Sequence, residues 1–222
     1  MDQMTGNISV EVYSDVVCPW CYVGKRRLDR ALVSIDDGVR VTWRPFQLNP
    51  TIPPSGIDRK TYLEAKFGSA EAFGRLEEQM LVAGEGEGIP FAFEKIQRTP
   101  NTFAAHRLIW YAEGLRKQDA MVEALFRAYF VEGRNIGNVK TLVQVAAEAG
   151  LDQAETEAYL SSDEGVTEVK AEEAAGHRLG IRGVPYFLLN GTYAIFGAQP
   201  PERIVAALKA VGADAVVRKV GG

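Results

Sequence analysis

Apolar and polar residues alternate in two short segments near the start of the chain, and a helical pattern lies between them. Residues 8–13 alternate as a strand with one buried face does, and residues 39–44 do the same. Residues 18–35 instead repeat apolar side chains at helical spacing, and Asp-Asp-Gly at 36–38 ends that segment. A strand, a helix and a second strand over this length predict two parallel strands joined by a right-handed crossover.

Helical periodicity dominates the middle of the chain, after a cluster of prolines and other breakers at 49–56. The expected helices run over 59–66, 70–82, about 99–114 (cap Thr99, then Pro100), 120–131, 139–149 (cap Asn138), 152–160 (cap Asp152) and 161–177 (cap Ser161). Strand character returns at 186–189 and 192–196, and Asn190-Gly191 between them predicts a tight hairpin. Pro200-Pro201 opens a last helix.

This order of elements predicts an α/β protein in which a β-α-β half and a β-β-α half enclose a large all-helical insertion. We expect residues 1–50 and 178–222 to form one discontinuous domain and residues 51–177 to form the helical domain.

Composition narrows the functional classes. The 222 residues are 46% hydrophobic and 24% charged, as in ordinary globular proteins, and the net charge of −4 comes without a basic run. Nucleic acid and anionic membranes are therefore not the expected partners. Neither a membrane-spanning stretch nor a secretory signal is visible, so we expect a cytoplasmic protein, whose paired cysteines are more often catalytic than structural.

The chemistry of the chain centres on its two cysteines, Cys18 and Cys21. Cys18 falls where the first strand meets the first helix, and Pro19 suits the first helical position because that residue needs no N–H donor. Unpaired N–H groups and the helix dipole favour a thiolate at Cys18. Cys21 lies nearly one turn further in and can attack a mixed disulfide formed at Cys18. The spacing therefore predicts a dithiol–disulfide exchange pair.

Two other interpretations of the pair are a zinc site and an inert pair of core cysteines. Zinc would need two further ligands, and the chain offers only His106 and His177, which lack the spacing of a zinc site. We therefore expect no metal. An inert Cys-x-x-Cys at a strand-to-helix junction is the less expected alternative.

Several segments resemble the thioredoxin-fold family of DsbA-like thiol–disulfide oxidoreductases that carry a helical insertion. The similarity rests on Cys18-Pro19-Trp20-Cys21, on Arg182-Gly183-Val184-Pro185 and on Asn190-Gly191. Residues 43–50 (WRPFQLNP) and 101–107 (NTFAAHR) look like the FrnE-type subgroup, which is related to 2-hydroxychromene-2-carboxylate isomerases.

The resemblance implies further site residues. Pro185 is expected to be cis and to face the dithiol, so that the backbone of Val184 can pair with an extended substrate. Trp20 is expected at the exposed rim or, alternatively, as an anchor of the helical domain. Possible substrate contacts are Phe46, Asn101, Phe103 and His106. For Asn101, a helix cap is as well supported as a substrate contact. For His106, a half-buried structural histidine is likewise as well supported as a substrate contact. Phe46 also suits the core.

The sequence departs from the family at one position. Relatives carry a buried acid six residues before the first cysteine, where this chain has Val12. The neighbouring Glu11 should point to the opposite face of the sheet. The acid that usually accepts the proton of the second cysteine, here Cys21, is therefore missing at this position.

The leading functional hypothesis is a thiol–disulfide oxidoreductase in which Cys18 attacks and Cys21 resolves. We expect no cofactor beyond the redox-active Cys18–Cys21 pair, with glutathione possible as co-substrate. The expected partners are protein or small-molecule disulfides and a glutathione, thioredoxin or glutaredoxin system. One alternative is a glutathione-dependent isomerase or transferase acting on an aromatic small molecule. Another is a non-catalytic polypeptide-binding or chaperone module.

Overall fold

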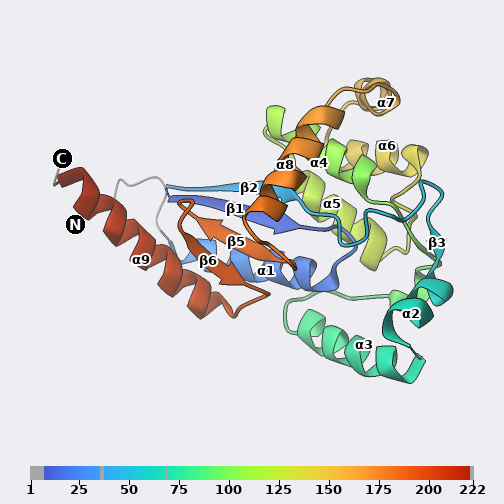
Figure 1. Ribbon diagram of the computed structural model, residues 1–222, viewed down its shortest axis with the longest axis horizontal. Helices are drawn as coiled ribbons and strands as arrows, with labels where there is room; N and C mark the ends of the chain where they lie inside the picture. Colours follow the sequence, from blue (N-terminus) through green and yellow to red (C-terminus); the bar gives the residue numbers. More distant parts are fainter. Residues whose placement is uncertain (1–7, 36–37, 69, 221–222) are drawn as a thin grey trace.

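The computed structural model describes residues 8–35, 38–68 and 70–220, and these form a four-stranded sheet with helices around it (Figure 1). The strand order is β2-β1-β5-β6. Strands β1 (Ile8–Ser14) and β2 (Val39–Pro45) are parallel and are joined by α1 (Pro19–Val33), which confirms the predicted crossover unit. The predicted helix end at residues 36 and 37 lies outside the described residues.

The C-terminal strands form the predicted hairpin. Strand β5 (Tyr186–Leu189) pairs antiparallel with β1, and β6 (Tyr193–Phe196) pairs antiparallel with β5. Asn190 and Gly191 both have positive φ, 47° and 68°, which a tight hairpin turn with the twist of its strands requires. The Asn190 side chain also accepts a hydrogen bond from the Ser9 N–H at 2.8 Å, so the turn is tied to the neighbouring strand.

Helices cover both faces of the sheet. On one face, α1 packs beside α9 (Pro201–Val220), and the buried Leu208 joins Val10 and Val12 in the main core. On the other face, α8 (Val166–Arg178) packs against β2, and a Cβ on Gly176 would come within 2.8 Å of the Tyr13 ring. Most of the segment predicted as an insertion lies beyond the sheet, whereas α8, which falls inside it, packs on the sheet itself (Figure 1).

The remaining elements lie within residues 51–177, the segment predicted to form the helical insertion. They are β3 (Ile57–Asp58), α2 (Arg59–Phe67), α3 (Ala70–Glu85), the 3₁₀ turn η1 (Phe93–Lys95), β4 (Arg98–Thr99), α4 (Phe103–Gly114), α5 (Gln118–Phe130), α6 (Val139–Glu148) and α7 (Gln153–Ser161). Two predicted caps are confirmed. The Asn138 side chain accepts hydrogen bonds from the first turn of α6, and the Asp152 side chain accepts one from the Glu155 N–H of α7.

Two other predicted caps are wrong. Thr99 is extended rather than a cap, because β4 pairs with β3, and α4 begins only at Phe103. Ser161 is the last residue of α7, and α8 begins after Gly165, whose φ of 74° suits a residue without a side chain. In both places a tertiary or backbone constraint overrides a local capping pattern.

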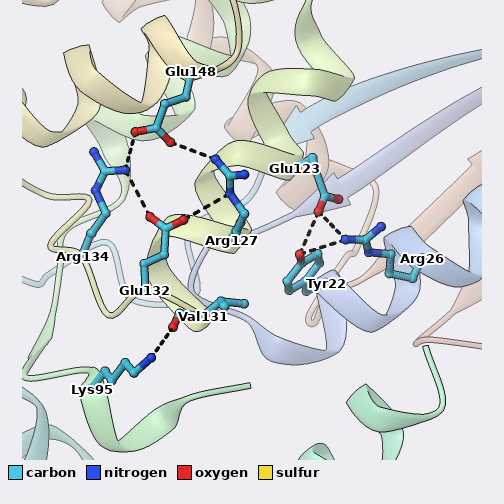
Figure 2. Close-up of polar contacts among 9 residues, drawn as sticks. All are labelled: Tyr22, Arg26, Lys95, Glu123, Arg127, Val131, Glu132, Arg134 and Glu148. Atoms are coloured by element: carbon cyan, nitrogen blue, oxygen red, sulfur yellow. Dashed lines mark hydrogen bonds and ion pairs between the residues drawn. The ribbon is translucent and has the colours of Figure 1, made fainter. Parts of the chain in front are cut away.

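Polar contacts join α1 to the insertion helix α5. The Tyr22 hydroxyl donates to the Glu123 carboxylate at 2.8 Å, and Arg26 pairs with the same carboxylate at 2.6 Å (Figure 2). The buried Lys25 ammonium pairs with three carboxylates, those of Asp29, Asp119 and Glu123. A second network in Figure 2 ties α5 to α6 through alternating charges: Arg127, Glu132, Arg134 and Glu148. The helix that begins at the cysteines is therefore fixed to the insertion.

Candidate active site

Cys18 is the N-cap of α1, and Pro19 occupies the first turn, as predicted. The Cys18 N–H donates to the Asp15 carbonyl at 2.9 Å, and the Cys21 N–H donates to the Cys18 carbonyl at 3.0 Å. A tight turn thus delivers Cys18 directly from β1 to the start of the helix. Cys18 therefore stands at the positive end of the helix dipole, which favours negative charge on its thiol.

Both thiols are free, and their surroundings differ. Cys18 is 6% exposed, and its thiol lies 3.6 Å from the Val184 carbonyl oxygen, to which it can donate. Cys21 is 0% exposed. Burial, followed by the hydrogen bond and the charge of Cys18, raises the pKa of the Cys21 thiol well above its usual value, while the Asp15 backbone and the Ser14 hydroxyl act to lower it.

Pro185 and Val184 lie at the dithiol, next to α1. The Val184–Pro185 peptide bond is cis. A Cβ added to Gly24 would lie 3.0 Å from Pro185 Cγ and 3.3 Å from Phe187 Cζ, so the absence of a side chain at Gly24 lets the proline pack against the helix. Trp20 is 36% exposed beside the cysteines, at the rim of this site.

Val12 and Glu11 lie as the sequence predicts for a sheet that lacks the family's buried acid. Val12 is fully buried, and Glu11 points to the other face, where its carboxylate pairs with Arg44 at 2.9 Å. A different buried acid, Asp15, stands in the turn before Cys18. Its carboxylate accepts the Leu48 N–H at 2.7 Å and lies 3.3 Å from His106 Nε2.

Sequence reasoning did not single out Asp15. The signal available was an acid placed between a buried strand and a Cys-x-x-Cys pair, three residues before the first cysteine. Its partners come from the loop after β2 and from α4, which no local pattern connects to it. Asp15 therefore links three separate segments directly behind the dithiol turn.

The four suggested substrate contacts fall into different environments. Phe46 is buried in a small cluster with Tyr13 and Tyr186, on the α8 side of the sheet. His106 is 3% exposed and faces Asp15. The Asn101 side chain is engaged by the backbone: it donates to the Ile52 carbonyl and accepts from the Phe103 N–H. Phe103 is half-buried, with the Lys170 ammonium over its ring.

Within the residues that the structure describes, no three His, Cys, Asp or Glu side chains gather as the ligands of a metal ion would. No helix in the same residues is long and apolar enough to cross a membrane.

The chain is similar to known proteins over most of its length. Residues 9–209 match the family of DSBA-like thioredoxin domains. The Bacillus subtilis protein YwbO is 29% identical over 191 residues, which cover 83% of this chain and 88% of that protein. The crystal structure of a probable DsbA oxidoreductase from Streptomyces coelicolor has a TM-score of 0.85 and 34% identity, covering 92% of this chain and 89% of that one.

More distant structures share the fold. A 2-hydroxychromene-2-carboxylate isomerase has a TM-score of 0.69 at 18% identity, covering 96% of this chain and 99% of its own. The cytosolic disulfide reductase DsbM from Pseudomonas aeruginosa, solved with GSH, has a TM-score of 0.62 at 19% identity, covering 95% of this chain and 98% of its own. The expected thioredoxin-like α/β fold with a helical insertion is confirmed. The chain belongs to the DsbA-like thioredoxin domain family, whose members include thiol oxidoreductases.

Proposed function

We propose that this protein is a thiol–disulfide oxidoreductase in which Cys18 attacks the substrate and Cys21 resolves the intermediate. The observation that carries the proposal is the asymmetry of the pair. Cys18 caps a helix N-terminus next to Val184, whereas Cys21 is fully enclosed and its pKa is raised. A thiolate is the nucleophile of disulfide exchange, so the cysteine at the helix terminus is the one prepared to attack first.

The reaction has two displacements. Cys18 Sγ attacks one sulfur of a substrate disulfide, a mixed disulfide forms, and the other substrate sulfur leaves as a thiolate. Cys21 then loses its proton and attacks Cys18 Sγ, which forms the Cys18–Cys21 disulfide and releases the second substrate thiol. Two external thiols, such as those of glutathione, return the pair to the dithiol form.

The backbone of Val184 is the proposed docking point for substrate. Val184 is half-buried, and its carbonyl faces the Cys18 thiol at 3.6 Å. An extended chain that pairs with this backbone would bring its disulfide to Cys18, as strand addition does in peptide recognition. Trp20, exposed at the rim, would cover one side of the bound chain.

Reduction or isomerisation is the proposed direction, with protein or small-molecule disulfides as substrates and glutathione as co-substrate. The shared fold of a cytosolic disulfide reductase solved with GSH supports this choice. A cytoplasmic glutathione pool would keep the pair mainly reduced. The intact pair favours exchange over glutathione-dependent isomerisation, because two free thiols at this spacing can form and release a disulfide.

Reduction of insulin disulfides, with and without glutathione, tests the proposal. We expect the native protein to accelerate reduction and Cys18→Ser to abolish the acceleration, because the attacking sulfur is lost. Thr99→Val, a buried change in the insertion, serves as the matched control and should keep full activity. Equal activity of Cys18→Ser and the native protein would contradict the proposal, and activity toward unfolded chains without either sulfur would favour a chaperone instead.

A further inference from the structure

The side chain of Ser14, the last residue of β1, has no role in the fold that the structure accounts for. Ser14 is 6% exposed, and its hydroxyl has no hydrogen-bond partner by ordinary distance and angle. Its backbone carbonyl is occupied, since it accepts the Phe46 N–H at 3.1 Å. A buried hydroxyl without a partner is costly, so such a group in a native structure calls for an explanation.

The strand directs this hydroxyl toward the dithiol. Side chains two residues apart share one face of a strand, so Ser14 lies on the same face as Val10 and Val12, which pack in the core with α1. Ser14 is one repeat nearer to the cysteines than Val12. The group beside its hydroxyl is the thiol of Cys21, whose negative form it favours.

The nearby acids are engaged elsewhere. Glu11 pairs with Arg44 on the opposite face of the sheet. The Asp15 carboxylate is held by the Leu48 N–H and His106, and Asp15 favours a Cys21 thiolate through its backbone. The side chain that adjoins Cys21 from β1 is therefore a hydroxyl rather than a carboxylate.

We propose that Ser14 is a positioning residue for the resolving step, in which its hydroxyl donates a hydrogen bond to the Cys21 thiolate as that thiolate forms. This inference rests on the proposed exchange reaction. Serine takes no proton here. Cys21 gives its proton to the departing substrate sulfur or to water, the Cys18–Cys21 bond forms, and the bond between Cys18 and the substrate breaks. The hydroxyl thereby compensates for the apolar side chain at Val12.

The experiment separates the two displacements. Reduced protein is mixed with a chromogenic bis(nitrobenzoate) disulfide at no more than one equivalent, and release of the coloured thiolate is followed in a stopped-flow instrument. The first release reports attack by Cys18, and the second reports resolution by Cys21. The variants are Ser14→Ala, which removes the hydroxyl, Ser14→Thr, which restores one, and Thr99→Val, which removes a buried hydroxyl in the insertion.

We expect Ser14→Ala to leave the first release within about twofold of the native rate and to slow the second roughly threefold to tenfold near neutral pH. Loss of a hydrogen bond to a charged sulfur lowers the thiolate fraction by roughly tenfold to a hundredfold. A more basic thiolate is also more nucleophilic, so the rate falls only by about the square root of that factor. The second release should therefore reach its plateau at a higher pH in Ser14→Ala than in the native protein, and above that pH the alanine variant should be the faster of the two.

The readout isolates the hydroxyl because the titratable groups near Cys21 stay unchanged in every variant. These are Cys18 and Asp15, with His106 in contact with Asp15. Ser14→Thr should recover most of the second rate, and Thr99→Val should match the native protein. If the threonine variant does not fold, the pH profile of Ser14→Ala decides alone.

Three results would overturn the assignment: an unchanged second release in Ser14→Ala, a slowing by the same factor at every pH, or an equal slowing in Thr99→Val. In each case, two releases of coloured thiolate by the native protein would still support the exchange reaction. A native protein that never gives the second release would contradict both the exchange reaction and the role of Ser14.

Discussion

Replacing Gly24 by alanine tests how closely α1 supports Pro185. The added Cβ would lie 3.0 Å from Pro185 Cγ, 3.4 Å from Pro185 Cβ and 3.3 Å from Phe187 Cζ, closer than ordinary contact. Overpacking of this kind costs about 1–3 kcal/mol. Alanine in a helix interior returns about 0.8–1 kcal/mol relative to glycine. We therefore expect Gly24→Ala to lower the free energy of unfolding by roughly 0–2 kcal/mol.

Gly74→Ala is the matched control, because Gly74 lies within α3 with no atom that a Cβ would meet within 4 Å. That variant should be stabilised by about 0.8–1 kcal/mol. The two variants should thus differ by roughly 1–3 kcal/mol, or several degrees in Tm, measured by thermal unfolding followed by circular dichroism. Gly24→Ala should also reduce insulin disulfides more slowly, because Pro185 and Val184 are displaced together. Equal stabilisation by both substitutions, with native activity, would refute the argument that Gly24 sets the position of Pro185.

Three further predictions concern the cysteines, alkaline pH and the insertion. A short alkylation pulse near neutral pH should label Cys18 before Cys21, because Cys21 is enclosed and its pKa is raised. Mass spectrometry would locate the label, and labelling of Cys21 first would reverse the two roles. Burial raises the pKa of Tyr129 from 10.0 to about 12, so the folded state holds this proton more tightly and stability should fall between those pH values, by roughly 3 kcal/mol. Urea unfolding at the two ends of this range checks the fall, and an equal slope in Tyr129→Phe would contradict it. Arg107→Lys should lower the free energy of unfolding by roughly 3 kcal/mol. The Arg107 guanidinium donates to four backbone carbonyls around the α7–α8 turn, and one ammonium cannot replace it. A urea midpoint equal to the native one would contradict this.

The parts of the fold that local patterns control were predictable. Alternation and helical spacing predicted β1, α1 and β2, because each buries one face against the next. Asn190-Gly191 predicted the hairpin, because few residue pairs accept two consecutive positive φ angles. Thr99 failed as a cap because the β3–β4 pairing, a contact across more than 40 residues, holds it extended.

The candidate site was predictable to a similar depth. The spacing of Cys18 and Cys21 and the proline between them placed the pair at a helix start. Asp15 was missed because its two partners lie 33 and 91 residues away in sequence. Ser14 was missed for a related reason. A small polar residue at the end of a strand is common, and only the burial of its hydroxyl without a partner points to a role in the site.

Trapping of a mixed disulfide tests the central claim most directly. Cys21→Ser should accumulate a covalent adduct with a protein disulfide or with oxidised glutathione, because Cys18 can attack but nothing resolves the product. Non-reducing electrophoresis and mass spectrometry should locate the adduct on Cys18, reducing agent should release it, and Cys18→Ser should form no comparable adduct. The absence of any adduct on Cys21→Ser, with both kinds of disulfide, would show that exchange through Cys18 is not the chemistry of this protein.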